Sequence, residues 1–214
     1  PAVTSEVDDQ PTFVESEHLQ KDDSGVEITS LSKKLKMNIG KDESGNIVYT
    51  LTDIENDELV IGKSNMDLVT SSLDGFAGSA FDSAEAFMVD ETRPYLGNVS
   101  EFTDRCVAAS VKMTKGDVVY YIEVKLYDNG VAFRYRLPDV SRDRVTAENT
   151  SFTIAKPGKI WYGKDSDCYE PEITSGVYAS IPVGNKLNGP ITIELANSSG
   201  YVALLEGFVG EDYI

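Results

Sequence analysis

The feature that most constrains the fold is a strict alternation of apolar and polar residues on both sides of a short turn, at residues 117–138. In the first half, one face collects Val118, Tyr120, Ile122, Val124 and Leu126. In the second half, one face collects Val131, Phe133, Tyr135 and Leu137. Asp128-Asn129-Gly130 is a turn sequence, and Pro138 cannot continue the ladder of hydrogen bonds. The pattern predicts an antiparallel hairpin in which Tyr120, Ile122, Val124, Phe133 and Tyr135 are buried together.

Similar short runs, separated by Gly, Pro, Asn and Asp, occupy most of the chain after Val26. Further strands are predicted at residues 31–40, 46–53, 57–64, 151–155, 176–183, 190–195 and 201–208. No stretch shows a sustained helical stripe with capping residues, so few and short helices are expected. Many strands with one apolar face bury that face best as two antiparallel sheets packed on each other. The sequence therefore predicts an all-β sandwich.

The first 25 residues have a different composition, dominated by acids, Ser, Thr and Gln without a helical or strand period. Such a segment is typical of a tail or linker. The predicted organisation is an acidic tail or linker at residues 1–25 and one β-sandwich domain at residues 26–214.

The charge balance excludes some partners. The 214 residues contain 19 basic and 36 acidic side chains, a formal net charge of −17, which repels nucleic acid and anionic lipid. No run approaches the ~20 apolar residues of a membrane span. No charged and apolar leader opens the sequence, so a signal peptide is either absent or has been removed, and a start at Pro1 without a methionine favours removal or truncation. A secreted or periplasmic protein is expected.

Few residues could support catalysis by the chain alone. P-loop, dinucleotide-binding, zinc-protease and serine-hydrolase motifs do not occur in the sequence, and the one histidine, His18, is interpreted as incidental. Paired carboxylates stay possible, but 36 acids make no single pair persuasive. Cys106 and Cys168 lack redox or metal spacing, and both free thiols and one disulfide stay open.

Four segments in fixed order resemble one known family. They are residues 35–68, residues 89–111, the KLYDNGVAFRYRLPD run at residues 125–139, and ALLEGFVGEDY at residues 203–213. Together, from about Val26 to the end, they resemble the amino-terminal domain of glycoside hydrolase family 97, bacterial α-glucosidases and α-galactosidases. The sequence departs from the family pattern at residues 93–96 and 105–108.

The resemblance implies a β-supersandwich like that of galactose mutarotases, followed in the parent enzyme by a (β/α)₈ barrel that carries the catalytic carboxylates. It also implies that Glu206, in ALLEGFVGEDY, is one ligand of an active-site calcium ion. Calcium collects ~6–8 oxygen ligands, so Glu206 alone is not expected to bind it tightly. We expect the barrel of the same polypeptide as partner and, through the parent enzyme, an α-glucoside or α-galactoside.

Residues 159–172 hold the other candidate site. Trp161, Tyr162 and Tyr169 offer aromatic faces and Glu170 a carboxylate, which suits contact with a sugar, whereas aromatic residues in β domains more often fill the core. The carbohydrate-contact candidates are Trp161, Tyr169 and Glu170.

Three functions are compatible with the sequence. The first is a non-catalytic domain that packs on a catalytic barrel and contributes one calcium ligand. The second is a lectin-like module that stands alone, and the third is a structural or adhesive sandwich.

Overall fold

The computed structural model describes residues 12–13, 17–138, 143–164, 172–196 and 200–207, and the chain forms two compact units, Pro1–Thr153 and Ile154–Ile214. The described part contains no α-helix, and its one complete 3₁₀ turn is η1 (Tyr178–Ser180). Every strand pairing is antiparallel. The all-β prediction with few, short helices is confirmed. Among the described residues, no helix is long and apolar enough to cross a membrane.

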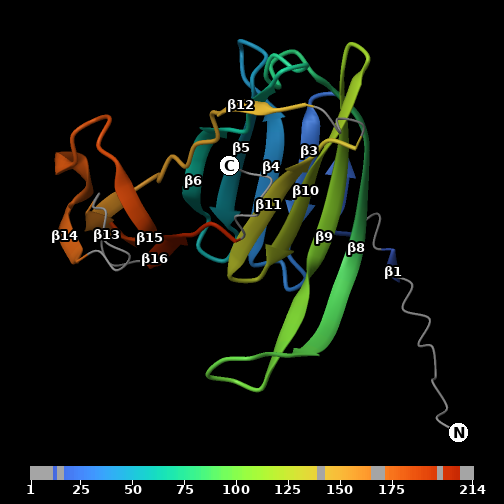
Figure 1. The fold of residues 1–214 in the computed structure, drawn as a ribbon. Coiled ribbons are helices and arrows are strands. Elements are labelled where there is room, and N and C mark those ends of the chain that lie inside the picture. Colours follow the sequence, from blue (N-terminus) through green and yellow to red (C-terminus); the bar gives the residue numbers. More distant parts are fainter. Residues whose placement is uncertain (1–11, 14–16, 139–142, 165–171, 197–199, 208–214) are drawn as a thin grey trace, which may run out of the picture. The chain divides into compact units, whose positions relative to one another are not determined.

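The first unit is a sandwich of two five-stranded sheets (Figure 1). Sheet A has the order β1 (Thr12–Phe13), β8 (Ala80–Pro94), β9 (Glu101–Lys115), β10 (Val118–Tyr127) and β11 (Gly130–Arg136). Sheet B has the order β2 (Leu19–Lys21), β3 (Gly25–Thr29), β4 (Leu35–Lys41), β5 (Ile47–Asp53) and β6 (Glu58–Asn65). The sheets face each other, since β2 contacts β8, β3 contacts β9 and β4 contacts β10. A separate pair joins β7 (Leu68–Thr70) to β12 (Val145–Glu148).

The predicted hairpin is β10 and β11, with Tyr127 opposite Gly130 across the turn. Tyr120 and Ile122 are fully buried and Val124 is 2% exposed, as the alternation predicts. Phe133 and Tyr135 share this face but are only half-buried, because β11 is the edge strand of sheet A. Both still join the core: the Phe133 ring lies 5.4 Å from that of Tyr49. The burial prediction is thus confirmed for β10 and overstated for β11.

The hairpin predicted across residues 31–53 is also present, as β4 and β5. Met37 and Ile39 on β4 are almost fully buried. The turn between the strands is held by Asp42, whose Oδ1 accepts hydrogen bonds from the backbone N–H groups of Ser44 and Asn46. Gly45 has φ of 82° in this turn, a conformation that residues with a side chain rarely adopt.

The longest hairpin was not predicted as such. β8 and β9 are 15 residues each and pair from Ala80 with Thr114 to Pro94 with Glu101. β10 pairs with β9 only as far as Val107, so the outer part of the hairpin is a two-stranded ribbon that extends beyond the rest of sheet A (Figure 1). That part pairs with no further strand, and although Asp104 and Cys106 are buried on it, its sequence lacks the apolar alternation that marks the other strands.

Two predicted strands are wrong. Residues 151–155 do not form a strand: their backbone bonds to β6 alternate with side-chain bonds, such as Thr153 N–H to Ser64 Oγ at 2.8 Å. Residues 176–183 contain the end of β14 (Ile173–Val177) and then η1, closed by the Ile181 N–H donating to the Tyr178 carbonyl. Pro182 has no N–H to donate, so this stretch cannot continue the ladder.

The expected tail at residues 1–25 contains β1 and β2, which pair with β8 and β3. The expected single domain at residues 26–214 contains the boundary between the two compact units. Both strands are short, and their neighbours in sequence are polar, so the composition of this segment gives little sign of them.

The second unit is one four-stranded sheet, sheet D, with the order β14, β13 (Pro157–Lys164), β15 (Leu187–Leu195) and β16 (Tyr201–Leu204). Its register places Ile160 opposite Ile193, and Ile193 opposite Val202, on one face. Ile160, Ile193 and Leu195 are buried on this face. The adjacent residues of each strand point to the opposite face, which is largely open.

Candidate functional sites

Glu206, the expected calcium ligand, lies just after β16 and is exposed. The neighbouring Leu205 is 71% exposed, so the segment stands at the surface. Among the described residues, no three His, Cys, Asp or Glu side chains gather in a way that could hold a metal ion. Glu206 is therefore available as a single carboxylate ligand, and a calcium site would need its other oxygen ligands from elsewhere.

Trp161 lies at the middle of β13, opposite Ser175 of β14 and Thr192 of β15. The ring centroid of Trp161 is 6.2 Å from that of Tyr201 on β16. The Nζ of Lys159 lies 4.7 Å from the Trp161 centroid. Tyr162 is the next residue of the strand and points to the other face. Tyr169 and Glu170 lie outside the described residues, in the segment between β13 and β14.

Tyr201 is a contact of Trp161 that the sequence did not reveal. The two residues are 40 positions apart and belong to strands separated by β15. Only the order of strands in sheet D brings them together. The available signal was that Tyr201 opens an alternating strand, but such a pattern does not identify which strand lies next to it.

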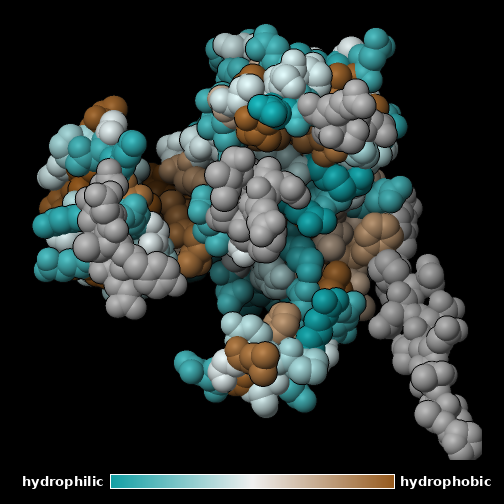
Figure 2. Space-filling model, in the orientation of Figure 1, coloured by the Kyte–Doolittle hydropathy of each residue, from teal (hydrophilic) through white to brown (hydrophobic). Residues whose placement is uncertain are grey.

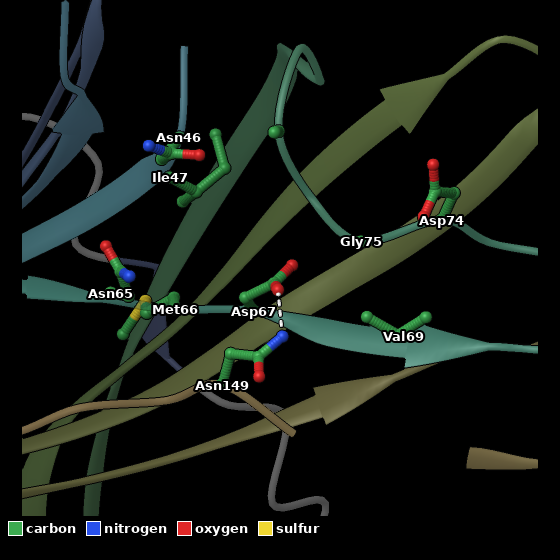
Figure 3. A pocket seen from close by; sticks show the side chains of 10 residues that line it. Asn46, Ile47, Asn65, Met66, Asp67, Val69, Asp74, Gly75 and Asn149 are labelled. Atoms are coloured by element: carbon green, nitrogen blue, oxygen red, sulfur yellow. Dashed lines mark hydrogen bonds between the residues drawn. The ribbon is translucent and has the colours of Figure 1, made fainter. Parts of the chain in front are cut away.

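One pocket of about 250 Å³ lies in the first unit, where the chain leaves β6 and enters β7. Its polar lining comes from Asn46, Asn65, Asp67, Asp74 and Asn149 (Figure 3). Both carboxylate oxygens of Asp67 already accept hydrogen bonds, from the Phe76 N–H at 2.6 Å and the Asn149 Nδ2 at 2.8 Å. Asp67 therefore holds the surrounding loops together, and the pocket lacks the aromatic walls that favour ring-shaped ligands.

A group of charged residues crosses the face of sheet A opposite the core. Asp104 on β9 is 6% exposed and accepts hydrogen bonds from Lys125 and from the Tyr127 hydroxyl, the latter at 2.8 Å. Burial alone would raise the pKa of Asp104, but these two donors outweigh it and lower the pKa below the ordinary value. The carboxylate stays ionised at neutral pH, which suits a structural ion pair and not a general acid.

Glu123 on β10 is held in the same way. It accepts from the Nε of Arg134 at 2.6 Å and from the Nε of Arg136. Burial would raise the pKa of Glu123, but the two guanidinium groups lower it. Arg136 also lies 3.9 Å above the ring of Tyr121, so its charge is fixed between an aromatic face and a carboxylate.

Cys106 is a fully buried free thiol beside Asp104. Burial, and then the nearby Asp104 charge, raise its pKa to about 11. The thiolate needed for nucleophilic or redox chemistry is therefore scarce at neutral pH. Cys168 lies outside the described residues. His18 is also buried, and its Nδ1 has no hydrogen-bond partner in the described part.

Apolar side chains gather at the end of the β8–β9 hairpin, as Figure 2 shows. Tyr95 is 54% exposed, Leu96 fully exposed and Val99 55% exposed. The Tyr95 and Phe102 rings meet edge to face at 5.9 Å. An exposed apolar group at the end of a two-stranded ribbon is typical of a surface that packs on another protein segment.

The fold and these sites define an all-β domain in which Asp104, Glu123 and Cys106 make structural contacts, while Glu206 is exposed. Residues 28–214 match the sequence profile described as "Glycosyl-hydrolase 97 N-terminal". The chain belongs to this family, as the sequence resemblance indicated.

A solved structure agrees in fold. The crystal structure of a beta-arabinopyranosidase has a TM-score of 0.71 and 18% sequence identity, over 86% of this chain. The match spans 31% of that enzyme's chain, so this chain corresponds to less than a third of it. No curated protein matches the chain.

Proposed function

We propose that this chain is the non-catalytic amino-terminal domain of a family 97 α-glycosidase and packs on a catalytic barrel in the same polypeptide. The observation that carries the proposal is the match to the family's amino-terminal profile over residues 28–214. It is supported by Asp104 and Glu123, whose carboxylates are each held in ion pairs with cationic side chains. The exposed apolar end of the β8–β9 hairpin offers a surface for such packing. A secreted or periplasmic location completes the proposal.

Within this function, Glu206 contributes one calcium ligand at the active site of the whole enzyme. Its exposure after β16 supports the role, because a carboxylate at the surface can reach a site formed by another domain. Bound calcium would supply a fixed positive charge that orients oxygen groups of the substrate. Trp161, Tyr169 and Glu170 are the proposed carbohydrate contacts.

Joining the chain to the rest of its open reading frame tests the proposal. The longer protein is expected to hydrolyse aryl α-glucosides or α-galactosides in a calcium-dependent manner, and the 214-residue chain is expected not to. Glu206→Gln removes one charge with little change of shape, so it should raise the calcium concentration needed for activity without changing the melting temperature of the calcium-free protein.

Glu43→Gln is the matched control, since Glu43 is an exposed glutamate in the turn between β4 and β5. An unchanged calcium dependence in Glu206→Gln would refute the ligand role. Hydrolysis by the 214-residue chain that a point substitution abolishes would refute the non-catalytic role.

The lectin-like alternative rests on Trp161 and its neighbours. This alternative would be favoured over the role as a glycosidase domain if the open reading frame ended near Ile214 and the chain itself bound sugar.

A further inference from the structure

The two faces of sheet D differ in chemistry as well as in burial. One face is aliphatic and covered, with Ile160, Ile193 and Leu195 at most 7% exposed. The register places Lys159, Trp161 and the residues opposite them on the other face, which is aromatic and polar. Its members are Lys159, Trp161, Ser175, Val177, Thr192, Glu194, Tyr201 and Ala203.

An aromatic pair dominates this open face. Trp161 is half-buried and Tyr201 is 65% exposed, and their rings are tilted by 48° at 6.2 Å. The two rings are close to each other although β15 separates their strands. Their combined surface is broad and fixed by the sheet, and aromatic surface of this kind packs against the C–H groups of a sugar ring.

Polar groups surround the pair at short range. The Nζ of Lys159 lies 4.7 Å from the Trp161 centroid. Ser175 and Thr192 lie directly opposite Trp161 on the two neighbouring strands and bring hydroxyl groups to the same face. An ammonium group and two hydroxyls next to aromatic rings match a ligand that alternates C–H faces with hydroxyl groups.

We propose that Trp161 and Tyr201 form a platform that binds one pyranose ring, with Lys159, Ser175 and Thr192 contacting its hydroxyl groups. The inference rests on the proposed function for its ligand class, and it adds Tyr201 as the second half of the site. A further β-layer is the competing occupant. A β-layer is disfavoured because the covered face of sheet D is aliphatic, whereas the open face carries a lysine, two hydroxyls and two amphipathic rings.

The chain contains one tryptophan, so its fluorescence reports on the platform directly. The 214-residue chain is titrated with methyl α-glucopyranoside, with methyl β-arabinopyranoside and with sorbitol, which has hydroxyl groups but no ring. Tryptophan emission, acrylamide quenching and titration calorimetry are recorded. A saturable emission change and reduced quenching are expected with at least one pyranoside and not with sorbitol.

Variants identify the residues. Tyr201→Ala should weaken binding by roughly 2- to 12-fold, the range of one aromatic contact, while Tyr201→Phe keeps the ring and should bind nearly as well as the wild type. Tyr95→Ala removes a tyrosine of similar exposure from the first unit and should leave binding unchanged. Because Tyr201 is largely exposed, the fold is expected to survive its replacement.

Three results would overturn the platform. They are the absence of both signals with every pyranoside, an equal response to sorbitol, and unchanged affinity in Tyr201→Ala. A longer polypeptide in which Trp161 is already shielded from acrylamide without sugar would identify a protein layer as the occupant instead. None of these results affects the Glu206→Gln test, so failure of the platform and failure of the proposed function are distinguishable.

Discussion

The two compact units bury their apolar residues in different ways. In the first unit, sheets A and B face each other, and both sides contribute fully buried residues such as Ile39 and Ile122. In the described part of the second unit, the buried apolar residues are Ile154, Ile160, Ile193 and Leu195, and one face of the sheet is open. A closed sandwich gains far more from burial than a single sheet covered on one face. The first unit should therefore carry most of the stability, and the second should be free to present a surface.

The largest expected effect is in the closed sandwich. Ile122→Ala removes buried volume from the middle of β10, where the packed sheets cannot collapse to refill it. It should lower the free energy of unfolding by ~2–5 kcal/mol, measured by urea denaturation followed by circular dichroism. Leu96→Ala removes similar volume from a fully exposed position at the hairpin end and should have almost no effect. Equal losses in the two variants would show that the sandwich core is not the main source of stability.

A smaller effect is expected at the ion pair of sheet A. Asp104→Asn leaves Lys125 and Tyr127 without their carboxylate, and should lower the free energy of unfolding at pH 7 by ~1–3 kcal/mol. The folded-state pKa of Asp104 is below its ordinary value, so its stabilisation is full above pH ~4 and is lost as the pH falls through the folded-state pKa.

The difference between wild type and Asp104→Asn should therefore shrink in acid. Asp90→Asn is the control, since the Asp90–Arg105 pair is about half exposed on both sides. Such surface pairs contribute ~0–1 kcal/mol. A difference that grows as the pH falls below 4 would contradict the assigned ionisation.

In the second unit, Ile160→Val removes one methyl group from the covered face of sheet D. The expected loss is ~0.5–1.5 kcal/mol, and it should appear in the unfolding transition followed by Trp161 fluorescence rather than in circular dichroism, to which the sandwich contributes most. In the wild type, the fluorescence transition should already occur at lower urea concentration. Coincident transitions by both probes would mean that the two units unfold as one.

The smallest effect expected is that of calcium on the isolated chain. Stabilisation by a ligand grows with its concentration relative to the dissociation constant, and one carboxylate binds calcium too weakly to register at ~1 mM. The melting temperature should be the same with calcium and with a chelator. A clear increase that Glu206→Gln abolishes would mean that the second unit contains a complete calcium site.

Much of the first unit followed from local sequence. The alternation in residues 117–138 and the turn at Asp128-Asn129-Gly130 predicted β10 and β11, because one face of each strand is buried and the other is not. The β8–β9 hairpin escaped prediction because its outer part pairs only with itself. Residues 151–155 have the composition of a strand, but they bond to β6 partly through the side chains of Ser64 and Ser151 and form no continuous ladder.

The same distinction between local sequence and tertiary contacts applies to the candidate sites. Glu206 and Trp161 were named as candidates from the sequence, Glu206 by resemblance and Trp161 as an aromatic residue near acids. The residues around them could not be predicted from the sequence, because the neighbours of a strand residue depend on which strands pair and in what order. Trp161 meets Tyr201 only because β15 lies between β13 and β16.

By itself, the sequence determined the period of the strands, the positions of the main turns, the acidic surface and the family to which the chain belongs. The tertiary structure decided which residues are covered, which ion pairs cross sheet A and which aromatic rings share a face of sheet D. The physical reason is that alternation acts through adjacent residues, whereas sheet order and packing depend on contacts between residues far apart in the chain.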